Sequence, residues 1–160
     1  MVKNSKNLLI KLIFLISVIA LISAFFIEYI LGHQPCNLCI LERIPYLLAI
    51  IIILLNFKFS HYEKFFILLL SIIFLAGTII SLYHLGIEQG FVQESLVCDL
   101  KGGSNLLSKE EILKQLQEKS VSCKDVTFKM FGLSLTSYNI LISILITFSA
   151  GKIYFNYDKN

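Results

Sequence analysis

Residues 33–57 read HQPCNLCILERIPYLLAIIIILLNF, and the fold of the chain depends on this stretch. Its second part, residues 44–57, is apolar but contains only 14 residues. At about 1.5 Å per residue, a helix of that length reaches roughly 21 Å, which is less than the roughly 30 Å hydrocarbon core of a membrane. A helix that spans a membrane here must include earlier residues. The polar segment 36–43 is therefore expected at the membrane boundary.

Pro45 leaves two interpretations of this segment open. Inside a helix, its ring would leave the carbonyl of Leu41 without its usual hydrogen bond and bend the axis. Alternatively, the regular helix begins near Pro45, and the two cysteines lie on an irregular segment before it. Under both interpretations Cys36 and Cys39 lie at membrane depth or just above it.

The composition of the whole chain also indicates a membrane protein. Of its 160 residues, 56% are hydrophobic and only 16% are charged, whereas soluble domains carry about 25% charged residues. The length suits a single domain, residues 1–160. The net charge is only +3 and the sequence has no dense run of Lys or Arg, so we expect no nucleic-acid partner.

Three further apolar segments are long enough to cross a membrane: residues 8–31, 65–87 and 130–151. The first is longer than the apolar region of a signal peptide, about 7–15 residues, and other spans follow it, so we interpret it as uncleaved. With a span at 38–57, these segments predict an all-α membrane protein, a bundle of four transmembrane helices. The last span carries small and hydroxyl side chains that suit close helix packing, namely Ser134, Thr136, Ser137, Asn139, Ser143 and Thr147.

Two of the connections contain the cysteines, residues 32–43 and the long polar loop 88–129. Within the long loop, Ser108 and Glu111 have the spacing of a capping box. An apolar stripe follows them, so we predict a short amphipathic helix over residues 109–118 that lies on the membrane surface.

Basic residues near the span ends predict the orientation of the chain. They gather before the first span, between the second and third, and after the fourth, and we place them on the cytoplasmic side: Lys3, Lys6, Lys11, Lys58, Lys64, Lys152 and Lys159. Both termini are therefore expected in the cytoplasm, and both cysteine-containing loops on the opposite side.

Four cysteines, Cys36, Cys39, Cys98 and Cys123, allow two disulfides in such an oxidising compartment. A zinc site is disfavoured because Cys98 and Cys123 are 25 residues apart and provide no second CxxC; we expect no metal. Two purely structural disulfides remain an alternative. However, a CxxC disulfide closes a very short loop and gives little entropic stabilisation, so its spacing favours redox chemistry.

Polar residues next to these cysteines point to the same chemistry. Arg43 follows Cys39 by four residues, so a helix would place both on one face, and a guanidinium there favours thiolate over thiol. Snorkelling toward lipid headgroups is the alternative for Arg43. His84, at the end of the third span, is expected at the same depth, and the two donors together could bind a lipid-soluble acceptor with two carbonyl oxygens. Glu42 is interpreted as a solvated or headgroup-facing charge.

The CxxC-x3-R motif at the start of the second span, followed by a long loop with two more cysteines, resembles the DsbB family. The most specific stretch is PCNLCILER, and YHLGIEQG and CKDVTFKMFGLSLTSYN are also similar to family segments. Proteins similar to vitamin K epoxide reductase have related chemistry on four spans, but carry their loop cysteines before the CxxC.

The resemblance implies a membrane thiol oxidoreductase of the bacterial inner membrane that re-oxidises a DsbA-like protein with a quinone, ubiquinone or menaquinone. It implies a Cys98–Cys123 disulfide that meets the partner at Cys98. Electrons would then pass to Cys36–Cys39, where Cys39 faces the quinone. Arg43 would polarise the quinone, and His84 falls near a quinone-contact position.

Redox potentials favour the same acceptor. DsbA, with a reduction potential of about −120 mV, is too oxidising to be regenerated by glutathione, whereas a membrane quinone can regenerate it; the DsbA–DsbB–quinone system is the known example. Two other functions remain open for this chain. One is a related oxidoreductase for a dedicated substrate, and the other is a non-enzymatic membrane scaffold held together by disulfides.

Overall fold

The computed structural model describes residues 2–93, 98, 122–124, 129–130 and 132–157. Its helices and strands, in chain order, are α1 (Val2–Tyr29), α2 (Asn37–Leu41), α3 (Ile44–Lys58), the 3-10 turn η1 (Ser60–Tyr62), α4 (Glu63–Glu88), β1 (Lys129–Met130), β2 (Leu133–Ser134) and α6 (Leu135–Asn156). The amphipathic helix predicted over residues 109–118 lies outside the described residues.

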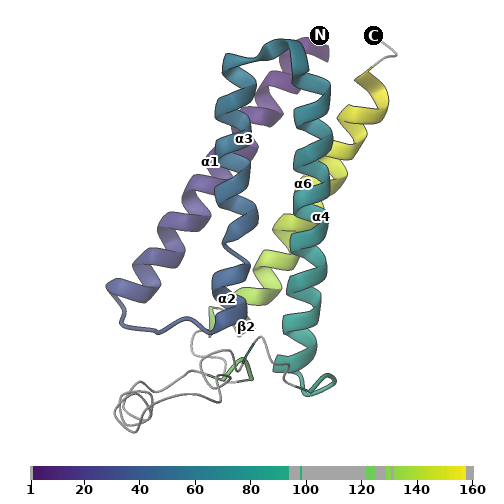
Figure 1. Ribbon diagram of the computed structural model, residues 1–160. Helices are drawn as coiled ribbons and strands as arrows, with labels where there is room; N and C mark the ends of the chain where they lie inside the picture. Colours follow the sequence, from purple (N-terminus) through teal and green to yellow (C-terminus); the bar gives the residue numbers. More distant parts are fainter. Residues whose placement is uncertain (1, 94–97, 99–121, 125–128, 131, 158–160) are drawn as a thin grey trace, which may run out of the picture.

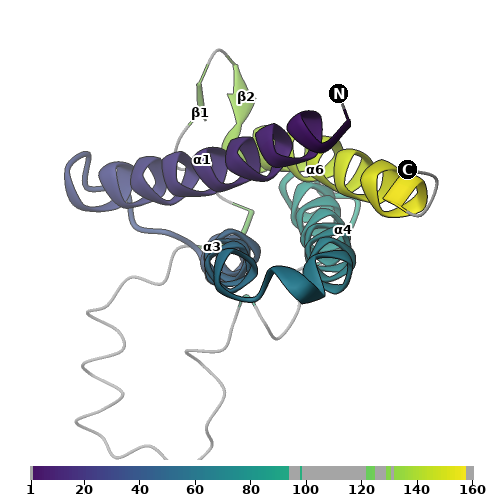
Figure 2. The same ribbon diagram turned by 90° about the horizontal axis from the view of Figure 1, so that it is seen from above.

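The described helices form the predicted membrane bundle. Counting α2 and α3 as one segment, four stretches are long and apolar enough to cross a membrane, and they are Lys6–Tyr29, Asn37–Lys58, Glu63–Glu88 and Leu135–Asn156. In Figure 2, α3 and α4 are seen nearly end-on, while α1 and α6 cross them obliquely. The expectation of an all-α, four-helix membrane fold is confirmed.

The second span is broken between α2 and α3, and each of the two interpretations of Pro45 is right in part. The short helix α2 ends at Leu41, Glu42 is its C-cap, Arg43 is the N-cap of α3, and Pro45 lies in the first turn of α3. Backbone N–H groups in the first turn of a helix have no partner within the helix, so a proline there removes no hydrogen bond. The regular long helix therefore starts near Pro45, but the cysteine pair begins a helical turn of its own rather than lying on irregular chain.

The fourth helix begins at Leu135, later than the predicted start at residue 130. The preceding residues form a small hairpin in which Lys129 pairs with Ser134. Its turn contains Gly132 with a positive φ of 84°, a conformation that glycine adopts without strain. The Ser134 side chain then caps the helix by accepting a hydrogen bond from the backbone N–H of Ser137 at 3.4 Å. Apolar periodicity alone could not locate this capped start.

The core lies where α1, α3, α4 and α6 meet, and its buried members are Ile10, Ile13, Tyr46, Ala49, Ile52, Ile53, Leu70, Phe74 and Ile146. Helix α4 approaches the start of α3 closely, because a Cβ added at Gly77 would lie 3.0 Å from Cγ of Pro45. Many large apolar side chains on the outside of the helices are exposed, among them Ile19, Ile51 and Leu145. Such a surface suits lipid rather than water.

Figure 1 shows both termini at the same end of the bundle as the connection between α3 and α4, with α2 at the opposite end. Lys6, near the N-terminus, forms an ion pair at 2.9 Å with Glu63, the first residue of α4 after that connection. The segments that carry the excess of lysines therefore lie together, and the cysteines lie at the other end. This grouping agrees with the arrangement expected from charge.

Candidate active site

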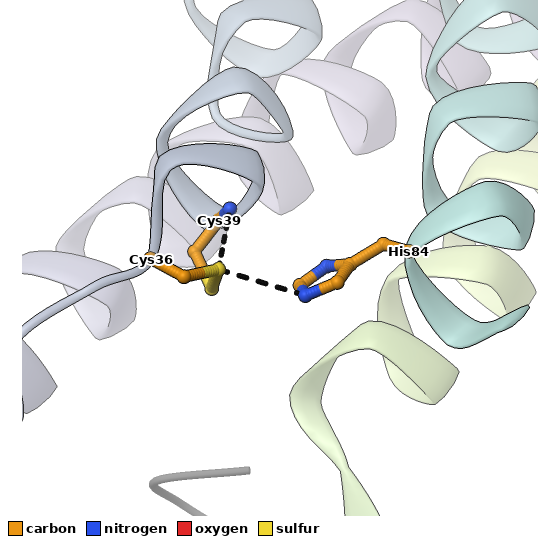
Figure 3. A group of neighbouring side chains, drawn as sticks. All are labelled: Cys36, Cys39 and His84. Carbon is orange, nitrogen blue, oxygen red and sulfur yellow. Dashed lines mark hydrogen bonds between the residues drawn. A yellow bond between two sulfur atoms is a disulfide. The ribbon is translucent and has the colours of Figure 1, made fainter. Parts of the chain in front are cut away.

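The CxxC pair lies at the N-terminus of α2 as a disulfide between Cys36 and Cys39, with 5.0 Å between their Cα atoms. Cys36 has an extended backbone and is the N-cap of the helix. Its Sγ accepts a hydrogen bond from the backbone N–H of Cys39 at 3.1 Å, as Figure 3 shows. The same donor would stabilise a thiolate at Cys36 after reduction, because such N–H groups favour negative charge.

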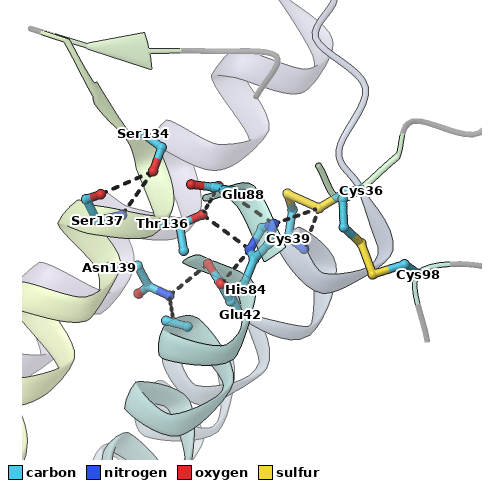
Figure 4. Close-up of polar contacts among 12 residues, drawn as sticks. Cys36, Cys39, Glu42, His84, Glu88, Cys98, Ser134, Thr136, Ser137 and Asn139 are labelled. Carbon is cyan, nitrogen blue, oxygen red and sulfur yellow. Dashed lines mark hydrogen bonds and ion pairs between the residues drawn. A yellow bond between two sulfur atoms is a disulfide. The ribbon is translucent and has the colours of Figure 1, made fainter. Parts of the chain in front are cut away.

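The second disulfide joins Cys98 and Cys123, whose Cα atoms are 5.9 Å apart. The pair is buried in one cluster with Cys36, Leu38 and Ile87, and Cys39 packs against that cluster. The side-chain amide of Asn37 also donates to the backbone carbonyl of Cys98 at 3.1 Å. The two cysteine pairs, far apart in sequence, therefore occupy one site, as Figure 4 shows for the labelled members.

His84 of α4 points at the CxxC pair (Figure 3). Its Nε2 lies 3.5 Å from Sγ of Cys36, and its Nδ1 lies 2.8 Å from Oε1 of Glu42. The hydroxyl of Thr136 is 3.2 Å from the same Nδ1. The imidazole is fully buried, so these groups replace the water that a histidine would otherwise contact.

The interpretation of Glu42 as a solvated charge is wrong. Its side chain is buried, and Oε2 accepts a hydrogen bond from the amide of Asn139 at 3.0 Å, while Oε1 faces His84. The hydroxyl of Tyr46 in turn donates to the amide oxygen of Asn139. The break between α2 and α3 turns Glu42 toward α4 and α6, and a continuous helix pattern in the sequence does not show this direction.

Arg43 has a partner that the sequence does not reveal. Its guanidinium donates from Nη1 to Oε2 of Glu28 on α1 at 2.5 Å and lies 5.3 Å from the centre of the Phe25 ring. Phe25 and Glu28 are three residues apart, so they share one face of α1. Arg43 is thus held at the head of α3 between a carboxylate and an aromatic ring, with only a small part of its side chain exposed.

Glu88 is a second buried carboxylate beside His84, one helical turn after it, with a side chain that is 6% exposed. Its Oε1 accepts a hydrogen bond from the Thr136 hydroxyl at 2.6 Å and lies 3.8 Å from Nε2 of His84. Its other oxygen, Oε2, has no hydrogen-bond partner in the described part of the chain. Thr136 and Asn139, interpreted from the sequence as packing residues, are therefore members of the polar site.

A metal remains a poor match to these residues. Among the described residues, Cys36, Cys39 and His84 could offer three ligand atoms within 4.8 Å of one another. However, both sulfurs are tied up in a disulfide, and a structural zinc site usually has four ligands with its cysteines as thiolates. The donor set instead fits thiol–disulfide chemistry assisted by a histidine.

This arrangement defines a class of protein, the membrane thiol–disulfide oxidoreductases: two adjacent disulfides, one a CxxC at the start of a span, beside a buried imidazole and carboxylate. The family model of disulfide bond formation protein DsbB matches residues 6–152. The chain belongs to the DsbB family, as its motifs predicted.

A relative of the chain is similar to it over nearly the full length of both. The uncharacterized protein RP370 of Rickettsia prowazekii (strain Madrid E) is 34% identical over 165 residues, which cover 99% of this chain and 94% of the relative. No solved structure matches the chain. Membership in the DsbB family, together with the four apolar helices, makes this chain a multi-pass membrane oxidoreductase that forms disulfide bonds.

Proposed function

We propose that this protein re-oxidises a DsbA-like dithiol protein and passes the electrons through Cys98–Cys123 and then Cys36–Cys39 to a membrane quinone. The observation that carries the proposal is the burial of both disulfides in one cluster. Thiol–disulfide exchange needs direct attack of one sulfur on another, so two pairs in one cluster suit electron transfer between them.

The first pair to react is the loop pair. In this proposal a thiolate of the partner attacks Cys98, and a second attack releases the oxidised partner and leaves Cys98 and Cys123 as thiols. One of these thiols then reduces the CxxC disulfide. Each attack breaks one S–S bond and forms another, and two successive attacks move two electrons from a dithiol to a disulfide without another co-reactant.

The residues around Arg43 suit a quinone, whose bound form would supply an acceptor for two electrons and two protons. Arg43 has five N–H donors and uses one for Glu28, so donors remain for a carbonyl oxygen. Ile40, Ile44 and Leu47 are apolar, exposed neighbours of Arg43 in the sequence, and they offer a lipid-facing approach. Ubiquinone and menaquinone both meet this description. A direct contact of His84 with the quinone remains a prediction.

Placement in the inner membrane of a bacterium, with both termini in the cytoplasm, is part of the proposal. The grouping of the lysine-rich ends supports this orientation. Maleimide reagents that cannot enter the cytoplasm should label the four cysteines after reduction. Labelling that requires an opened inner membrane would reverse the orientation.

The decisive experiment mixes the purified protein with reduced DsbA and a quinone and follows quinone reduction. We expect turnover that depends on both substrates. Absence of quinone reduction with reduced DsbA, together with turnover of another trapped dithiol protein, would favour the dedicated-substrate alternative. Disulfides that stay oxidised in a membrane depleted of quinone would favour the scaffold.

A further inference from the structure

The acid–base groups around the CxxC pair form a set that the proposed electron path does not use. His84 lies between two buried carboxylates, Glu42 from the link between α2 and α3 and Glu88 from its own helix. Of the described residues on α6, the neutral Thr136 and Asn139 face this set (Figure 4). Cys36 is the titratable group near Nε2, and the ring also interacts with the backbone of Cys123.

The hydrogen bonds around His84 assign a different task to each ring nitrogen. Glu42 has no proton to donate as a carboxylate, so it accepts the N–H of Nδ1. The Thr136 hydroxyl gives its proton to Glu88 and can only accept from the same Nδ1. The neutral ring then carries its lone pair on Nε2, which lies 3.5 Å from Sγ of Cys36. This is the geometry of a general base for the Cys36 thiol.

Glu42 is itself held in place by a series of buried groups. Asn139 donates to Glu42 and to the Ser81 hydroxyl at 2.7 Å, and its oxygen accepts from Tyr46. Glu42 thus has a fixed position relative to His84 that comes from three different helices. Burying such groups costs free energy unless each is hydrogen-bonded, and replacing the whole set with apolar residues would avoid that cost. Its presence beside the reactive sulfurs indicates chemistry.

We propose that His84 is a catalytic base and acid for Cys36, and that Glu42 is the residue that positions it; this rests on the proposed function. When the dithiol is oxidised, the S–H bond of Cys36 breaks and its proton moves to Nε2 of His84. The Cys36 sulfur then bonds to the Cys39 sulfur. Two electrons and two protons leave the dithiol for a quinone, which becomes a quinol, and the proton held by His84 is one of those two. Reduction of the disulfide returns a proton to Cys36 by the same route.

A measurement without quinone tests this role separately from the proposed function. In a full-length chain with Cys39, Cys98 and Cys123 changed to Ser, Cys36 is the only thiol. Its reaction rate with iodoacetamide is measured between about pH 5 and 8, the range over which histidine titrates. The variants are His84→Ala, with and without added imidazole, Glu42→Gln, and Thr78→Val as a matched control. Thr78 is buried in the same helix and bonds to the carbonyl of Phe74, away from the site.

We expect His84→Ala to slow alkylation near neutral pH by at least about tenfold, because the thiolate is the reactive form, and imidazole to restore part of the rate. Glu42→Gln should give a smaller loss and Thr78→Val none. Rates in both site variants equal to the control would overturn the proposal. So would slower quinone reduction in His84→Ala with unchanged alkylation, which would assign His84 to the quinone. If His84→Ala does not fold, the isosteric Glu42→Gln decides alone. Failure of the wild type to reduce quinone, with alkylation still dependent on His84, would overturn the proposed function and support this role of His84.

Discussion

The two ends of the helix bundle contain similar groups in different surroundings. At the end with the termini, Lys6, Glu63 and Tyr157 contact one another, and the side chains of the ion pair are each 18% exposed. At the cysteine end, the His84–Glu42 pair is 2% and 10% exposed. An ion pair that is partly open to solvent is worth little and costs little, whereas a fully buried one is expensive unless every member is hydrogen-bonded. Of these two groups, the one at the cysteine end is therefore the one whose burial calls for a chemical explanation.

The largest expected effect is the loss of quinone reduction when a cysteine of the CxxC pair is replaced, compared with a replacement at the other end of the bundle. Cys36→Ser or Cys39→Ser removes the disulfide that, in the proposed function, reduces the quinone, so quinone reduction with a reduced DsbA should fall to the uncatalysed rate. Exchange between the partner and Cys98–Cys123 should persist, and trapping of a mixed disulfide measures it. Lys6→Ala, at the other end, is the control and should keep wild-type turnover. Continued quinone reduction by either cysteine variant would break the assignment of the site.

Arg43 should give the next effect. If Arg43 donates to a quinone carbonyl as proposed, Arg43→Gln removes a charge-assisted hydrogen bond worth about 1.5–3 kcal/mol, so quinone reduction should slow by roughly ten- to a hundredfold. Arg43→Lys should recover only part, because an ammonium lacks the planar set of donors. The measurement is the rate against quinone concentration for the wild type and both variants. Wild-type kinetics in Arg43→Gln would mean that this arginine only anchors the helix to Glu28 and the lipid.

Glu42→Ala tests the cost of burial at the cysteine end. The change leaves one amide hydrogen of Asn139 without its acceptor and leaves Nδ1 of His84 with only the Thr136 hydroxyl. A buried donor left unpaired costs about 1–3 kcal/mol. We expect a lower free energy of unfolding, measured by denaturant in detergent. Stability equal to the wild type would show that water replaces the carboxylate, and the cysteine end would then resemble the end with the termini.

The smallest effect is expected for Glu63→Ala at the end with the termini. An ion pair that is partly open to solvent contributes about 0.2–1 kcal/mol, so the same unfolding experiment should show a shift near its limit of detection, reduced further by salt. Turnover should not change. A loss as large as that of Glu42→Ala would remove the contrast between the two ends.

Much of this fold can be predicted from length and hydrophobicity. Segments of about 20 or more apolar residues predict spans, and the short run at 44–57 predicts that the second span includes earlier residues, as the span Asn37–Lys58 does. The predicted start of the last span is wrong, because the hairpin and the cap at Ser134 depend on turn geometry rather than on hydrophobicity. A pattern of apolar residues has no information about which polar residue caps a helix in space.

The site could be predicted only in part. Cysteine spacing and the family motifs point to the reactive sulfurs, Arg43 and His84, because those residues are conspicuous in the sequence. Their partners are not. Glu28 comes from another helix, and Glu42 is turned inward by a break in the chain. A glutamate next to an arginine usually suggests a surface charge, and only three-dimensional packing shows that these two neighbours face opposite sides. Among these partners, only Glu88 could be found from the sequence, because residues four apart on a helix share a face and Glu88 follows His84 by four residues.

The link of two residues between α2 and α3 leaves no freedom in chain length. Glu42 reaches α4 and α6, while Arg43 reaches α1. Each residue added to a helix rotates the rest of that helix by about 100°, so an insertion between Cys39 and Pro45 would redirect at least one of these side chains or move the cysteines from Ile87. Related proteins that share these contacts of Glu42 and Arg43 should therefore keep the number of residues from Cys39 to Pro45 constant, even where their other connections differ in length.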